Sequence, residues 1–146
     1  MTNTLLLVID DDIEYLENAK EFLEEYGFDV RTTADANEAC QMLTEGSYAA
    51  VLIDLHLEDS RNIFNYSGLT LVDRINAFST IPKIIITKYK DFDALQKAKS
   101  SKLHGKSQVA EYILKMDGLP KLLEVLERLL IPKRVFISYV SEDREP

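Results

Sequence analysis

Uninterrupted apolar runs alternate along this chain with segments in which apolar residues recur every three or four positions. A run that is apolar throughout predicts a strand buried on both faces, and the three-to-four spacing predicts an amphipathic helix. The predicted strands are residues 5–9, 28–32, 49–54, 83–87 and 110–115, and the predicted helices are residues 12–26, 36–43, 69–78, 92–98 and 119–130. Strand and helix therefore alternate five times, which predicts a doubly wound α/β fold with a parallel sheet.

The second predicted strand differs from the others because its apolar residues alternate with polar ones. Phe28, Val30 and Thr32 are separated by Asp29 and Arg31. This pattern indicates one wetter face and favours a place at the edge of the sheet. The solid runs then form its interior. Residues 58–67 and 100–108 show no clear element and are predicted to be loops.

Bulk properties exclude several classes of protein. The net charge of −8 over 146 residues disfavours direct nucleic-acid binding by this chain. Cys40 is the single cysteine, so no intramolecular disulfide can form, which fits a reducing compartment. The apolar run near the N-terminus is too short for a signal peptide, and none approaches the length of a membrane span. We expect a soluble, cytoplasmic protein.

Polar side chains follow the predicted strands where those strands end. Asp10 and Asp11 follow the first strand, Asp54 ends the third, Thr87 ends the fourth and Lys115 ends the fifth. The carboxyl ends of parallel strands share one edge, and ligands bind there at the point where the winding reverses. In the strand order 2-1-3-4-5 that point lies between strands one and three. Folding should therefore gather the three aspartates.

Three carboxylates in one crevice repel one another and raise one another's pKa, and a divalent cation removes that cost. Mg²⁺ favours one or two carboxylates together with waters and phosphate oxygens. The backbone carbonyl of His56 would be a further oxygen ligand. A carboxylate beside Mg²⁺ can attack a phosphoryl group and form an aspartyl phosphate. Lys115 would offset charge on the transferred oxygens, and the Thr87 hydroxyl can donate a hydrogen bond to one of them.

Four segments, LLLVIDDD, AAVLIDLHL, KIIITK and EYILK, resemble the receiver domain of two-component response regulators. The resemblance covers residues 4 to about 130 and implies a flavodoxin-like (βα)5 fold. It implies that Asp54 is the phosphoacceptor and that Asp10 and Asp11 help to bind Mg²⁺. It also matches Thr87 to the switch residue, Tyr112 to the strand-five aromatic residue and Lys115 to the lysine of the site.

The same resemblance implies how the chain signals. A sensor histidine kinase or phosphotransfer protein would supply the phosphoryl group, and an output domain or effector protein would read the result. Phosphorylation would draw the Thr87 hydroxyl toward the phosphoryl group and move Tyr112 inward. We expect this to change a partner surface or a homodimer contact near Tyr112. The chain would not be an enzyme beyond its own Mg²⁺-dependent phosphorylation and dephosphorylation on Asp54.

The sequence departs from the receiver pattern in four places. Glu58 and Met116 stand where receivers usually have proline. The loop that leads to Gly68 and the segment between Thr87 and Lys115 are both longer than usual. None of these departures removes a phosphorylation residue. They bear on loop geometry and on the usual signalling face, which is built from helix four, strand five and helix five.

Residues 132–146 lie outside the receiver pattern, which we assign to residues 1–131. This tail contains the apolar run VFISY followed by a polar SED loop. It resembles the opening of a Toll/interleukin-receptor (TIR) domain, which would make the chain the front part of a longer protein. The alternative is an added strand or an exposed extension.

Two other functions fit parts of the pattern. VIDDDI also satisfies the Asp-x-Asp motif of haloacid-dehalogenase phosphatases, with Asp10 as nucleophile and Asp12 as the second acid, but the paired acids of a later strand are missing. A receiver-like binding module that works without phosphate is the third reading. Among single residues, Cys40 is expected in the core. His56 and His104 are expected to be surface or loop residues and not metal ligands. Two separated histidines and the distant Cys40 do not make a zinc site.

Overall fold

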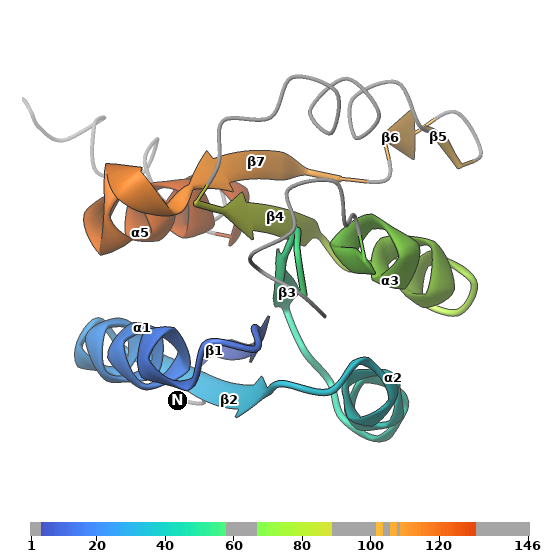
Figure 1. Ribbon diagram of the computed structural model, residues 1–146, viewed down its shortest axis with the longest axis horizontal. Coiled ribbons are helices and arrows are strands. Elements are labelled where there is room, and N and C mark those ends of the chain that lie inside the picture. The colour runs from blue at the N-terminus through green and yellow to red at the C-terminus, as the bar shows by residue number, and fades with distance from the viewer. Residues whose placement is uncertain (1–3, 58–66, 89–101, 104–105, 108, 131–146) are drawn as a thin grey trace, which may run out of the picture.

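The computed structural model describes residues 4–57, 67–88, 102–103, 106–107 and 109–130. Its centre is a five-stranded sheet in which every neighbouring pair is parallel, in the order β2-β1-β3-β4-β7 (Figure 1). The strands are β1 (Thr4–Ile9), β2 (Phe28–Thr33), β3 (Ala50–Asp54), β4 (Lys83–Thr87) and β7 (Glu111–Leu114). This confirms the flavodoxin-like order 2-1-3-4-5 and the place of the alternating strand at the edge.

Described helices lie on both faces of the sheet (Figure 1). Helices α1 (Ile13–Glu25) and α5 (Leu119–Leu130) lie on one face, and α2 (Ala36–Glu45) and α3 (Ser67–Asn76) lie on the other. The central strands are therefore covered on both sides. This explains why their sequences are apolar at every position and not at alternate positions.

Side chains of β1 show how one strand serves two cores. Leu6 and Val8 pack with the residues of α1 and α5, whereas Leu7 and Ile9 pack with those of α2 and α3. All four are buried. Successive side chains of a strand point to opposite faces, so a solid apolar run supplies both cores at once.

Helix α1 has a capping residue before its first turn and a glycine after its last. Asp12 caps its N-terminus and accepts a hydrogen bond from the backbone N–H of Tyr15 at 3.2 Å. Gly27, just after its end, has a φ of +95°, a conformation that side chains other than glycine rarely adopt. Together these residues fix where the helix leaves β1 and where the chain turns into β2.

Several expected positions differ from those observed. Ile13, Tyr26 and Phe78 are apolar residues of the predicted helices 12–26 and 69–78, but all three are exposed. Phe78 also lies beyond the end of α3 at Asn76. Apolar spacing marks which face of a helix is buried, but the ends of a stripe extend past the sheet that covers it. Cys40 is partly buried against the core, as expected.

The segment before the last strand is also more regular than predicted. A loop was expected, but β5 (Lys102–Leu103) and β6 (Lys106–Ser107) form a short antiparallel ribbon. The last strand of the sheet ends at Leu114, and Lys115 begins the 3-10 helix η1 (Lys115–Asp117). Other expectations lie outside the described residues: the helix at 92–98, the loop from Glu58, His104 and the tail 132–146.

Candidate phosphorylation site

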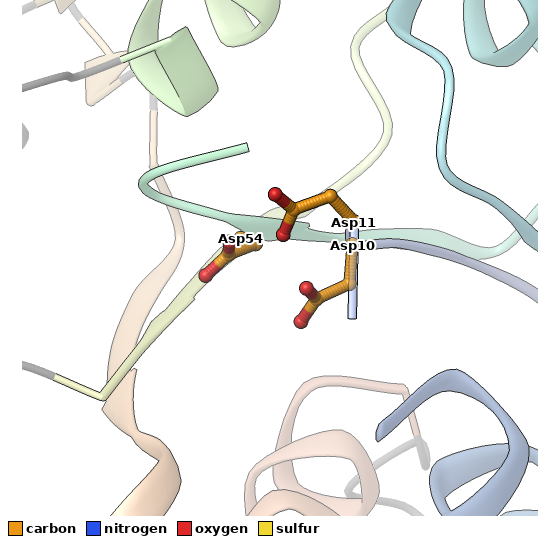
Figure 2. Close-up of side chains that lie close together, drawn as sticks. All are labelled: Asp10, Asp11 and Asp54. Carbon is orange, nitrogen blue, oxygen red and sulfur yellow. The ribbon is translucent and has the colours of Figure 1, made fainter. Parts of the chain in front are cut away.

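Three aspartates meet at the carboxyl ends of β1 and β3 (Figure 2). Asp10 and Asp11 directly follow β1, and Asp54 is the last residue of β3. The register pairs Ile9 with Ile53, so the residues that follow them are neighbours across the sheet. Each aspartate offers one carboxylate oxygen, and these three oxygens lie within 4.8 Å of one another. The structure thus brings together the acids that the strand-end pattern placed in one crevice.

Lys115 joins this group from the end of β7, which is an edge strand of the sheet. Its Nζ lies 2.6 Å from Oδ2 of Asp10 and 3.9 Å from Oδ1 of Asp54. Because Lys115 begins η1 immediately after β7, the strand end fixes the root of the side chain while the butyl stem reaches across to the acids. One ammonium thus faces two of the three carboxylates.

Burial of the acids changes their protonation. Asp10 is 1% exposed and Asp54 is 3% exposed. Burial, and then the charge of Asp10, raises the pKa of Asp54 to about 7, although Lys115 opposes the shift. Burial also raises the pKa of Asp10 above its ordinary value, against the hydrogen bond and the charge of Lys115. Lys115 therefore does not fully offset the cost of burying these two carboxylates as anions.

Two carboxylate oxygens of the cluster are buried without a hydrogen-bond partner among the described residues. They are Oδ1 of Asp11 and Oδ2 of Asp54. A buried carboxylate oxygen without a partner is costly, and a bound cation is one way to satisfy it. Hard divalent cations prefer oxygen ligands of this kind. The donor set therefore fits Mg²⁺, and the backbone carbonyl of His56 belongs to the same turn after β3.

Thr87 and His56 form a second, buried pair beside the acids. Thr87 is the last residue of β4 and is fully buried, and its Oγ1 lies 3.4 Å from Nδ1 of His56. His56 lies in the turn that follows β3, so its prediction as a loop residue holds, but it is 1% exposed and therefore not at the surface. Leu55 and Leu57 on either side of it are buried as well, so the chain stays in the core past the end of β3.

Tyr112 occupies the middle of β7 and is partly buried. It lies beside Ile85 of β4 in the register and packs against the core that α2 and α3 cover. Thr87 pairs with Leu114, two residues further along β7. Tyr112 is therefore on the strand next to Thr87, with an aromatic ring in contact with the apolar core.

Two residues that the sequence did not single out contribute to the site. The ring of Tyr15, in the first turn of α1, lies 4.3 Å from Nζ of Lys115, which is a cation–π contact. Gly68, at the start of α3, donates its backbone N–H to the carbonyl of Leu55 at 2.8 Å. A Cβ on Gly68 would lie 2.3 Å from the carbonyl oxygen of Asp54. Helix α3 can thus approach the backbone of Asp54 because residue 68 has no side chain.

Residues 6–128 match the family described as the response regulator receiver domain. The chain belongs to this family of two-component signalling proteins. Within the family pattern, the described helices and strands are those of a receiver. None of the described helices has the length and apolar character that a membrane crossing requires.

Relatives and solved structures agree with the family assignment. The chain is 37% identical over 82 residues to the transcriptional regulatory protein CpxR homolog of Haemophilus influenzae, a match that covers 56% of this chain and 33% of that protein. It therefore spans about a third of that curated relative.

The fold resembles a CheY-like receiver domain from Methanospirillum hungatei with a TM-score of 0.72 at 22% identity, over 88% of this chain and 94% of the other. It also resembles a response regulator from Burkholderia pseudomallei described with a phosphorylated aspartic acid and a calcium ion. There the TM-score is 0.67 at 20% identity, over 99% of this chain and 76% of the other.

Proposed function

We propose that this receiver takes a phosphoryl group on Asp54 with Mg²⁺ as cofactor and thereby switches a partner surface. The observation that carries the proposal is the cluster of three carboxylates within 4.8 Å, two of which keep buried oxygens without a partner. Asp10, Asp11, Asp54 and the backbone carbonyl of His56 would hold the cation. Bound there, Mg²⁺ would neutralise charge on the carboxylates and on the transferred phosphoryl oxygens.

The residues of the chain supply the rest of the chemistry. A carboxylate oxygen of Asp54 attacks phosphorus while the bond from phosphorus to the imidazole nitrogen of the donor breaks, and that electron pair stays on the nitrogen. Lys115, 3.9 Å from Asp54, stabilises negative charge on the phosphoryl oxygens. Thr87 donates its hydroxyl to one of them. The product is an aspartyl phosphate.

The switch follows from where Thr87 lies. Movement of its hydroxyl toward the phosphoryl group shifts β4, and Tyr112 on the neighbouring β7 repacks inward. The surface near Tyr112 then differs between the two states, which suits an output domain, an effector protein or a second copy of the chain. A sensor histidine kinase or phosphotransfer protein would donate the phosphoryl group, and we place the chain in the cytoplasm.

For residues 132–146 we propose the start of a TIR-like output domain. The support is the VFISY run followed by SED, directly after α5. This segment lies outside the described residues, so the proposal is independent of the site. Sequencing the reading frame beyond Pro146 tests it: a TIR domain is expected, and a stop codon at that point contradicts it.

Phosphorylation can be tested with acetyl phosphate and Mg²⁺, followed by the mass of the intact protein. Wild type should gain one phosphoryl group, and the gain should disappear with EDTA and in Asp54→Asn. Asp12→Asn is the matched control, since Asp12 caps α1 with its side chain exposed to solvent. An unmodified wild type in the presence of Mg²⁺ would refute the proposal.

The same experiment separates the two alternatives. A haloacid-dehalogenase phosphatase would be labelled at Asp10 and would turn over many phosphoesters. The structure gives Asp12, the second acid of that motif, to the cap of α1, which argues against it. A phosphate-independent binding module would fold but bind neither Mg²⁺ nor beryllofluoride.

A further inference from the structure

The buried contact between His56 and Thr87 has no part in the phosphoryl transfer described above. His56 follows Asp54 by two residues, and its Nδ1 lies 3.4 Å from the Thr87 hydroxyl oxygen. We propose that the His56 side chain is a positioning residue that holds this hydroxyl in the unphosphorylated arrangement and so opposes the switch. The inference rests on the proposed function, because it concerns the hydroxyl that the phosphoryl group would draw.

Backbone hydrogen bonding between β3 and β4 fixes the position of His56 relative to Thr87. The hydrogen bond from the Leu55 N–H to the Ile86 carbonyl, 2.9 Å long, continues the β3–β4 ladder one residue past Asp54. It fixes the backbone directly before His56 to the backbone directly before Thr87. The imidazole and the hydroxyl are therefore placed by the sheet itself, and a movement of the Thr87 hydroxyl changes its distance to Nδ1.

Burial decides how much the contact matters. His56 is 1% exposed and Thr87 is fully buried, so bulk water does not replace a contact that is lost. A buried hydrogen bond is favourable by a net amount of about 1 kcal/mol, which is about fivefold in an equilibrium constant. The Thr87 hydroxyl carries one hydrogen, so in the tautomer in which Nδ1 accepts it, donation to the phosphoryl group requires that this contact be given up. The side chain at position 56 then sets part of the balance between the two states.

The positioning role of the His56 side chain is separate from the role of its backbone carbonyl as a metal ligand. The cation would use the backbone carbonyl of His56, which any residue at this position supplies. The imidazole points instead to the switch residue. Substitutions that keep the backbone but change the side chain can therefore separate the two roles.

Beryllofluoride with Mg²⁺, which imitates the phosphoryl group on a carboxylate, is the probe. His56→Leu has a similar volume but no polar atom, and we expect it to lower the half-saturating beryllofluoride concentration about fivefold at saturating Mg²⁺. His56→Asn keeps a polar atom near the place of Nδ1 and should recover most of the wild-type value. Weaker or equal binding by His56→Leu would overturn the inference.

A double-mutant cycle separates positioning from a general change in packing. Thr87→Val removes the hydroxyl and keeps the shape of the side chain. In that background, His56→Leu should change beryllofluoride binding less than twofold, because the contact it removes is already absent. A fivefold gain that persists with valine at position 87 would show that the effect does not pass through the hydroxyl and would contradict the proposal.

A measurement on wild-type protein covers the case in which the leucine variant does not fold. With ¹⁵N-histidine labelling, the Nδ1 resonance of His56 should move when beryllofluoride is added to protein already saturated with Mg²⁺. A resonance that stays in place while beryllofluoride binds would refute the positioning role. A protein that binds no beryllofluoride at all would instead refute the proposed function, and the inference with it.

Discussion

The ammonium of Lys115 lies 2.6 Å from the Asp10 carboxylate, closer than its 3.9 Å from Asp54. In this state the lysine therefore compensates mainly the charge of Asp10. The same carboxylate faces the site where Mg²⁺ would bind. In the proposed function, Lys115 and Mg²⁺ would thus compete for the negative charge of the pocket before phosphorylation, and both would stabilise the phosphoryl oxygens afterwards.

Lys115→Met should separate these two effects. Without the ammonium, Mg²⁺ should bind up to about tenfold more tightly, because a positive charge next to its ligands is gone. The rate of phosphorylation by acetyl phosphate should nevertheless fall about a hundredfold, since a charge that stabilises the transition state is lost. Calorimetric Mg²⁺ titration and the time course of intact mass measure the two quantities. Lys121→Met removes the same charge from the exposed face of α5 and is the control. Weaker Mg²⁺ binding by Lys115→Met would contradict the argument.

The Tyr15 ring supports Lys115 from the side of α1. Replacing it with leucine should slow phosphorylation about fivefold, the size of a partly desolvated cation–π contact. Tyr15→Phe keeps the ring and should stay close to wild type. If phenylalanine slows the reaction as much as leucine does, the hydroxyl and not the ring is what matters.

Stability of the metal-free protein should depend on pH through Asp54. Its pKa rises on folding from 3.8 to about 7, so the folded state binds this proton more tightly than the unfolded state. The resulting stabilisation is complete below the unfolded pKa of 3.8 and is lost as pH rises through 7. Between pH 5 and pH 8, wild type in EDTA should lose about 2 kcal/mol more free energy of unfolding than Asp54→Asn.

Urea unfolding at the two pH values measures this difference. Saturating Mg²⁺ should reduce it, because the cation stabilises the ionised form of the carboxylate. Glu17→Gln removes one carboxylate from the exposed face of α1 and should behave like wild type. Identical pH profiles for wild type and Asp54→Asn would show that the burial of Asp54 carries no such cost.

Gly68 should be difficult to replace because α3 begins against the backbone of the site. The added Cβ of Gly68→Ala would lie 2.3 Å from the Asp54 carbonyl oxygen and 2.8 Å from the Leu55 Cα, and neither is the tip of a flexible side chain. We expect a loss of about 2 kcal/mol in the free energy of unfolding, together with weaker Mg²⁺ binding.

Gly46→Ala is the matched control for Gly68→Ala. Its Cβ would lie 2.9 Å from an atom of the Tyr48 ring and 3.5 Å from the backbone oxygen of Met42, so the close contact is with a side chain and not with the backbone. Its cost in urea unfolding should be less than half as large, with Mg²⁺ binding retained. Equal losses in the free energy of unfolding for the two variants would mean that the close approach of α3 to Asp54 costs no more than the contact with Tyr48.

The sequence predicted the acidic cluster because parallel topology alone brings strand ends together. Asp10, Asp11 and Asp54 need no detailed packing to become neighbours once the strand order is known. The burial of His56 was not predicted, because it depends on how the chain leaves β3. The apolar Leu55 and Leu57 on either side of it were the signal that the chain stays in the core.

Tyr15 and Gly68 could not be found from spacing. The contact of Tyr15 with Lys115 joins α1 to the end of β7, and it depends on how the helix is rotated against the sheet. Gly68 matters because of a close approach between α3 and β3, which a sequence does not state. Local patterns fix the elements, whereas these two contacts arise from the way the elements pack.

Asp54 is the proposed phosphoacceptor. Borohydride reduces an aspartyl phosphate to homoserine, so treating the acetyl phosphate product and mapping its peptides locates the modified residue directly. We predict homoserine at position 54 when Mg²⁺ is present and none when it is removed. Homoserine at position 10 or 11, with residue 54 still aspartate, would contradict phosphorylation on Asp54.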